Sequence, residues 1–117
     1  MFKVAIIGGD KTKDYNFFKH KCCYLLQKKS ETDTIFIYSL GDEFVDRFGK
    51  EFNIDVQIME QIFSKYKKNL DEMKNDDIFD ELDALIVFKT IRGAEYIYNA
   101  AKERNIPARL IKKINAV

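Results

Sequence analysis

A strand of the buried type runs directly into a glycine turn in the stretch Lys3-Val4-Ala5-Ile6-Ile7-Gly8-Gly9-Asp10. Its apolar residues are nearly continuous, which is typical of a parallel strand that is covered on both faces. Far downstream, Ile91-Arg92-Gly93-Ala94 forms a similar turn between an apolar run and a helical pattern. Glycine turns at the carboxyl ends of strands are where open α/β sheets bind nucleotide phosphates. The two stretches therefore indicate a fold class and a class of ligand.

Strand and helix patterns alternate along the whole chain, with no linker, repeat or low-complexity segment between them. Apolar runs predict strands at 2–7, 34–38, 54–58, 83–88 and 108–111. The 3.6-residue spacing of apolar side chains predicts helices at 14–29, after Asp42, within 61–81 and at 93–104. The run at 83–88 is apolar throughout and is expected at the centre of the sheet, whereas 54–58 alternates and is expected nearer an edge. This order predicts one α/β domain, 1–117, with a doubly wound, mainly parallel five-stranded Rossmann-like sheet and helices on both faces.

The composition narrows the function classes. Hydrophobic residues make up 46% and charged residues 33% of the 117 residues, which is typical of a single folded domain. Because no apolar run approaches the roughly 20 residues of a membrane helix, we expect a cytoplasmic protein that does not bind membranes. The net charge of +1 argues against nucleic-acid binding, so we interpret Lys65, Lys67 and Lys68 as a solvated helix face.

The two cysteines are adjacent and are not expected to form a disulfide. In a helix they point about 100° apart, so Cys22 is predicted to pack inward and Cys23 to lie on the flank. His20, the single histidine, is predicted to be a surface residue. These residues do not converge as zinc ligands or as a nucleophilic pair, so neither a metal nor a cofactor is expected.

Several residues have local structural interpretations. Asp42 is predicted to be the N-cap of the second helix, whose inner side would carry Phe44, Val45, Phe48 and Phe52, with its carboxylate accepting an amide of the first turn. Asn105 tolerates the left-handed conformation that ends a helix. Tyr96 and Tyr98 are two residues apart on a helix and cannot share a face, so at least one is expected to contact solvent or another subunit. Gly49 falls inside a helix pattern and has no functional interpretation.

Four of the five glycines, Gly8, Gly9, Gly41 and Gly93, fall at three strand exits that face one rim of the predicted sheet. At Gly8 and Gly9 the alternative is a turn that only requires positive φ. Arg92 is the best candidate for a phosphate clamp, and Asp10 or Asp42 for holding ribose hydroxyls or capping a helix. A valine at Gly9 is expected to project toward the ligand. The predicted ligand-binding residues are Gly8, Gly9, Asp10, Ser39, Gly41, Lys74, Asn75, Arg92, Gly93 and Ala94.

Four segments together resemble the SLOG superfamily, a Rossmann-like group that includes YpsA-like, DprA-like and LOG-like proteins. They are Lys3–Gly9 with Asp14-Tyr15; Ile37–Gly41 with Asp46; Tyr66–Asn75; and Ala84–Phe88 with Arg92-Gly93-Ala94 and Ile106-Pro107. The resemblance implies nucleotide binding, homo-oligomers, and sensing or sequestering of signals in conflicts between bacteria and phages.

The departures from that family favour binding over cleavage. Ala94 stands where the family has a threonine, Lys74 at an arginine position, and Ile97 at the position of the hydrolytic glutamate. The first hypothesis is therefore a protein that binds a phosphorylated ribose, such as an NAD or ADP-ribose type of molecule, without cleaving it. The second is a small enzyme acting on an N-glycosidic or phosphate bond through Asp10, Asp42 or Glu95. The third is an interaction module that uses exposed tyrosines and the basic segment 65–68.

Overall fold

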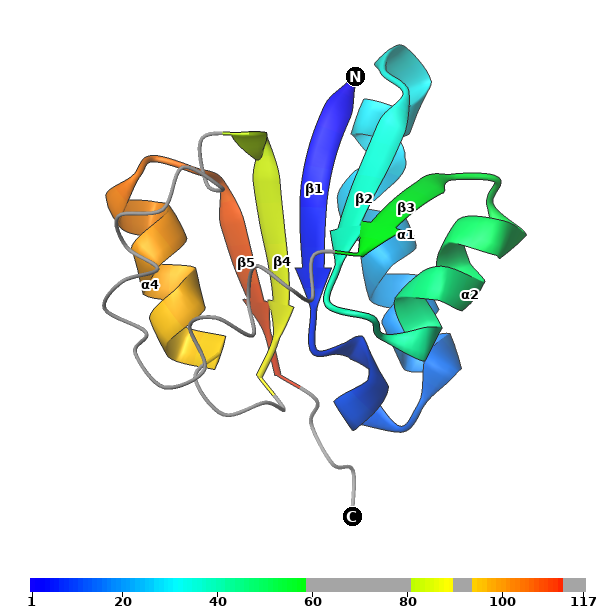
Figure 1. Ribbon diagram of the computed structural model, residues 1–117, viewed down its shortest axis with the longest axis horizontal. Coiled ribbons are helices and arrows are strands. Elements are labelled where there is room, and N and C mark those ends of the chain that lie inside the picture. The colour runs from blue at the N-terminus through cyan, green and yellow to red at the C-terminus, as the bar shows by residue number, and fades with distance from the viewer. Residues whose placement is uncertain (59–80, 90–93, 113–117) are drawn as a thin grey trace.

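The computed structural model describes residues 1–58, 81–89 and 94–112 (Figure 1). The elements, in chain order, are β1 (Phe2–Ile7), the 3-10 helix η1 (Gly9–Thr12), α1 (Tyr15–Thr32), β2 (Ile35–Ser39), α2 (Glu43–Glu51), β3 (Asp55–Ile58), β4 (Ala84–Phe88), α4 (Ala94–Glu103) and β5 (Ala108–Ile111). The strands predicted at 2–7 and 108–111 have the predicted bounds, whereas α1 continues beyond its predicted end at Lys29. The helical segment predicted within 61–81 lies outside the described residues, apart from Glu81.

The five strands form one sheet in which every neighbouring pair is parallel, with the order β3-β2-β1-β4-β5. This confirms the predicted α/β fold class. The alternating strand β3 lies at an edge, as predicted. The wholly apolar strand β4 is an interior strand between β1 and β5, although the middle strand of the five is β1. The chain builds the sheet outward from β1 to β3 and then resumes at β4 on the other side of β1. The strand order therefore reverses between β1 and β4.

Helices cover both faces of the sheet, with α1 and α2 on one side and α4 on the other (Figure 1). The core on the α1/α2 side is rich in aromatic rings. Phe18 is fully buried at its centre, and its ring centroid lies 5.2 Å from that of Phe88 and 6.0 Å from that of Phe48. The aliphatic side chains of Val4, Ile6 and other strand residues lie beneath these rings.

The α4 face is packed with smaller residues. Ala94, Ala100 and Ala101 of the helix are buried against the strands, together with Ile97. Only 6% of Ile97 is exposed, so the position that the family resemblance assigns to a hydrolytic glutamate is a core position here. Alanines allow the helix to approach the sheet closely because they add little volume at the contact.

The structure explains Gly49 and corrects the placement of Phe52. A Cβ at Gly49 would lie 2.5 Å from Val56 Cγ2 and 2.9 Å from the carbonyl oxygen of Ile54, so α2 passes too close to β3 for any side chain there. Val45 and Phe48 are buried as predicted. Phe52, however, is the C-cap of α2 and is 42% exposed, because the helix ends before it can turn this side chain inward.

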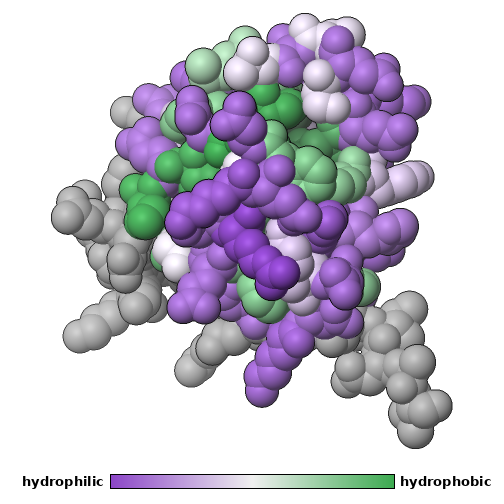
Figure 2. Space-filling model, turned by 90° about the vertical axis from the view of Figure 1, so that its right-hand side faces the viewer, coloured by the Kyte–Doolittle hydropathy of each residue, from purple (hydrophilic) through white to green (hydrophobic). Residues whose placement is uncertain are grey.

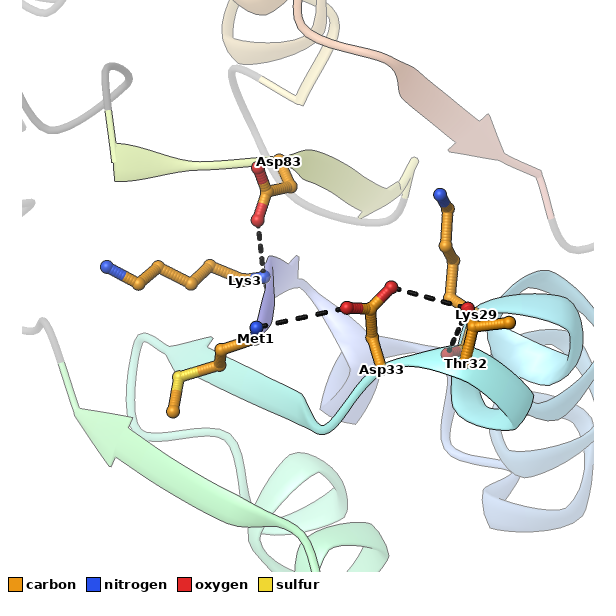
Figure 3. A network of polar contacts seen from close by, with 6 residues as sticks. All are labelled: Met1, Lys3, Lys29, Thr32, Asp33 and Asp83. Carbon is orange, nitrogen blue, oxygen red and sulfur yellow. Dashed lines mark hydrogen bonds and ion pairs between the residues drawn. The ribbon is translucent and has the colours of Figure 1, made fainter.

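Hydrogen bonds and an ion pair connect the amino end of β1 with the residues that precede β2 and β4 (Figure 3). The backbone amide of Lys3 donates to Asp83 Oδ2 at 2.8 Å, and the amide of Asp83 donates back to the carbonyl oxygen of Lys3 at 2.8 Å. The N-terminal ammonium of Met1 lies 3.9 Å from Asp33 Oδ1, at the turn between α1 and β2.

At the C-terminal end of α4, Asn105 has φ 60°, the left-handed conformation predicted for it.

Candidate functional site

The exits of β1 and β2 come together at one end of the sheet, and we call this region the β1–β2 rim (Gly8–Asp10 and Ser39–Phe44). Gly8 follows β1 with φ 85°, a conformation that residues with a side chain rarely adopt. Glycine adopts it without strain, so the turn favours glycine at this position. Its backbone amide donates to Asp42 Oδ2 at 3.0 Å. The two strand exits are therefore joined by a direct hydrogen bond between residues 34 positions apart in the chain.

Gly9 faces the core. A Cβ at this residue would lie 2.5 Å from Cε2 of Phe18, whose side chain is completely buried. The expectation that a valine here would project toward a ligand is therefore wrong. Glycine is required at this position because the turn after β1 lies directly against the Phe18 ring.

Ser39 and Gly41 form the turn after β2. Ser39 is 2% exposed, and its Oγ accepts the backbone amides of Gly41 at 3.0 Å and of Asp42 at 3.3 Å. Gly41 has φ 96°, again a conformation that glycine adopts without strain. The Ser39 hydroxyl thus holds the turn that delivers Asp42 to the rim.

The carboxylate of Asp10 binds the first turn of α2. Its Oδ2 accepts the amide of Glu43 at 2.8 Å, and its Oδ1 accepts the amide of Phe44 at 2.7 Å. Asp42 was predicted to be the N-cap of α2 and to accept an amide of its first turn with its carboxylate. The position is confirmed, but the hydrogen bond is not formed. Asp42 occupies the N-cap position, but it makes no side-chain cap hydrogen bond because its carboxylate reaches Gly8 instead.

Thr12 also belongs to the turn after β1, although its sequence position did not single it out. Its Oγ1 donates to the carbonyl oxygen of Gly9 at 2.8 Å, and the residue is buried. Asp14 follows as the N-cap of α1 and accepts the amide of Phe17 at 3.1 Å. A cap signal at Asp14, only a few residues after β1, is a sequence feature that points to a compact turn here.

The remaining predicted site residues fall on the α4 side. Ala94 is the first residue of α4 and is buried in the core. Lys74, Asn75, Arg92 and Gly93 lie outside the described residues, as does Tyr66. The structure therefore brings Gly8, Gly9, Asp10, Ser39 and Gly41 together at the β1–β2 rim and places Ala94 at the start of the helix that follows β4.

A second polar group joins α1 to α2. The hydroxyl of Tyr15 donates to Glu51 Oε2 at 2.6 Å, and Lys19 Nζ donates to Glu51 Oε1 at 2.6 Å. The guanidinium carbon of Arg47 lies 3.9 Å from the centroid of the Tyr15 ring, a cation–π contact. The hydrogen bonds from Lys19 and Tyr15 lower the pKa of Glu51, whereas burial and the Glu51 bond raise the pKa of Tyr15. This group links the two helices.

The cysteines are placed as predicted. Cys22 is completely buried and Cys23 is half-buried. Burial raises the pKa of both thiols, which disfavours the thiolate form that a nucleophile or metal ligand requires. His20 is exposed on α1, in agreement with the prediction. Within residues 1–58, 81–89 and 94–112, no group of three or more His, Cys, Asp or Glu side chains is arranged to hold a metal ion.

A hollow of about 550 Å³ lies between α1 and the turn from α2 to β3. Figure 2 shows this side of the molecule, where apolar surface lies in a depression among polar side chains. Its apolar lining includes Leu26, Ile35, Phe48 and Phe52. Because Thr34 and Ile35, which also line it, begin β2, the hollow lies at the opposite end of that strand from the β1–β2 rim.

Among the helices that the structure describes, none has both the length and the apolar character needed to cross a membrane. Comparisons with known protein families, with curated proteins and with solved structures found no match to this chain.

Proposed function

We propose that this chain binds a nucleotide or a nucleotide-derived small molecule at the carboxyl ends of its strands. The observation that carries the proposal is the reversal of strand order between β1 and β4. In open α/β sheets, ligands bind in the crevice outside the carboxyl ends of the strands at such a reversal. The turn at Gly8 follows β1, and the helix α4, which starts at Ala94, follows β4, so one segment follows each of the two strands at the reversal.

Two further features support a nucleotide-type ligand. Asp10 and Asp42 supply carboxylates at the β1–β2 rim, and carboxylates in this part of such folds accept hydrogen bonds from ribose hydroxyls. Arg92 and Gly93 immediately precede α4 in the sequence, where a helix N-terminus adds positive potential that favours phosphate. The ligand would then span the reversal point.

The buried position of Ile97 favours binding without cleavage. An aliphatic core residue occupies the place where the resembled SLOG enzymes carry their glutamate, so that acid–base group is missing. Within this proposal the ligand is of the NAD or ADP-ribose type. The protein acts as a sensor or a sequestering protein, as a cytoplasmic homo-oligomer, in conflicts between bacteria and phages.

The proposal is tested by a thermal-shift panel of nucleotides, NAD, ADP-ribose and cyclic ADP-ribose forms, combined with mass spectrometry of small molecules released from the purified protein. Saturable stabilisation by one class, with the compound recovered unchanged, is the expected result. Absence of stabilisation by every compound would contradict nucleotide binding. Recovery of free base would instead favour the enzyme hypothesis.

The residue-level test uses Arg92→Ala on the identified ligand. Loss of a charge-assisted hydrogen bond of roughly 1.5–3 kcal/mol weakens binding about ten- to a hundredfold, measured by calorimetry. The matched control is Lys102→Ala, which removes a cation from the last turn of α4, the end away from the proposed site. Equal affinity in Arg92→Ala and the parent protein would remove Arg92 from the site.

A further inference from the structure

The first amides of α2 are already occupied by an anion that belongs to the protein. A helix N-terminus presents unpaired backbone amides and positive potential, and it is a ready binding position for phosphate. Here both oxygens of Asp10 take that position, at 2.8 Å from the amide of Glu43 and 2.7 Å from the amide of Phe44. Asp10 therefore stands where a phosphate would otherwise bind.

The amide of the first glycine turn is occupied in the same way. Gly8, which follows β1, donates its amide to the carboxylate of Asp42 at 3.0 Å. The two carboxylates thus cross over. Asp10, which follows β1, binds the first turn of α2, and Asp42, which follows β2, binds the turn after β1. At each of the two strand exits, the backbone amides that could bind an anion are therefore hydrogen-bonded to a carboxylate from the other exit.

Acidic side chains in the first turn of α2 also disfavour the binding of phosphate there. Glu43 and Asp46 lie in the first turn of the helix, so the rim carries these two acidic residues in addition to Asp10 and Asp42. A phosphate approaching the α2 amides would meet like charges as well as occupied donors.

We propose that Asp10 and Asp42 exclude phosphate from the β1–β2 rim and thereby set the direction in which the ligand binds. This inference rests on the proposed function and specifies the same site. The phosphate-bearing end of the ligand lies away from the α2 N-terminus, and its hydroxyl-bearing end faces the two carboxylates. Asp10 is the specificity-determining residue, because its carboxylate accepts the backbone amides of both Glu43 and Phe44.

The test titrates inorganic phosphate and pyrophosphate into the protein and follows the amide resonances of Glu43 and Phe44 by NMR. In the parent protein these resonances are expected to stay unchanged. In Asp10→Ala the freed amides are expected to bind phosphate, with an affinity at least roughly tenfold higher than in the parent. Asp10→Asn, which keeps the shape and one acceptor oxygen, is expected to lie between the two and serves if the alanine variant fails to fold.

The matched control is Asp46→Asn, which removes one negative charge from the same helical turn but leaves the Asp10 hydrogen bonds in place. It is expected to change phosphate binding much less than Asp10→Ala, because the amides of Glu43 and Phe44 stay occupied. The inference is overturned if phosphate shifts Glu43 and Phe44 in the parent, or if Asp10→Ala gains no phosphate binding. Because the titration uses no nucleotide, a negative nucleotide panel would remove the proposed function without changing this result.

Discussion

The two faces of the sheet are packed by different means. On the α1/α2 face, rings from Tyr15, Phe18, Phe44, Phe48 and Phe88 contact one another at centroid distances of 5.2–6.1 Å. On the α4 face, alanines and aliphatic residues bring the helix onto the strands. Large rings fill much volume beneath α1 and α2, whereas the small alanines of α4 fill little, so the two faces of the sheet are packed with side chains of different size.

The difference explains the glycine pair after β1. Gly9 is required because the turn runs against the Phe18 ring, and Gly8 is required by its positive φ. Both demands come from packing and backbone conformation on the aromatic face. The glycine pair by itself therefore carries no information about a ligand, and the case for a site depends on the strand-order reversal and the two carboxylates.

The largest expected effect is at Phe18. Phe18→Ala leaves a cavity at the centre of the aromatic face and is expected to lower the free energy of unfolding by about 3–5 kcal/mol, measured by urea denaturation. The control on the same helix is Tyr24→Ala, whose side chain is 73% exposed and whose loss is expected to stay within about 0.5 kcal/mol. Similar losses in both variants would mean that the aromatic face is not a fixed core.

A smaller effect is expected at Gly9. The Cβ of Gly9→Ala would overlap the Phe18 ring and lower the free energy of unfolding by about 1–3 kcal/mol. In the double variant Gly9→Ala/Phe18→Leu, the smaller leucine leaves room for the new Cβ. The loss of unfolding free energy in the double variant should therefore be smaller than the sum of the losses in the two single variants. A double-mutant cycle with a coupling of at least about 0.5 kcal/mol is the expected result. Strict additivity would show that Gly9 does not lie against Phe18.

The smallest effect is expected at the surface of the aromatic face, where Glu51 binds Tyr15 and Lys19. Because the folded protein lowers the pKa of Glu51 below its ordinary value of 4.5, the bonds stabilise the fold fully above that pH. This contribution is lost as the pH falls through the lowered pKa. Thermal melts of Glu51→Gln and the parent protein should therefore differ most near neutral pH and converge in acid. A difference that persists unchanged at low pH would exclude the carboxylate as its source.

Much of the fold follows from local patterns. The apolar run of β4 and the alternation of β3 predict their interior and edge positions, because the number of covered faces decides which side chains a strand tolerates. The inward position of Cys22 and the left-handed Asn105 follow from helix geometry and from a helix-ending signal, and both are confirmed. In the candidate site, the meeting of the β1 and β2 exits follows from the parallel sheet.

What the sequence determined by itself is therefore the order of the elements within the described residues and the sheet class, since both depend on apolar patterns of residues near one another in the chain. Only the tertiary structure decided that Asp10 binds α2, that Asp42 binds Gly8 and that Gly9 lies under Phe18. Two of these contacts join residues 33 and 34 positions apart. They depend on which strands are neighbours and on how the helices pack over them, and neither is encoded in a local pattern.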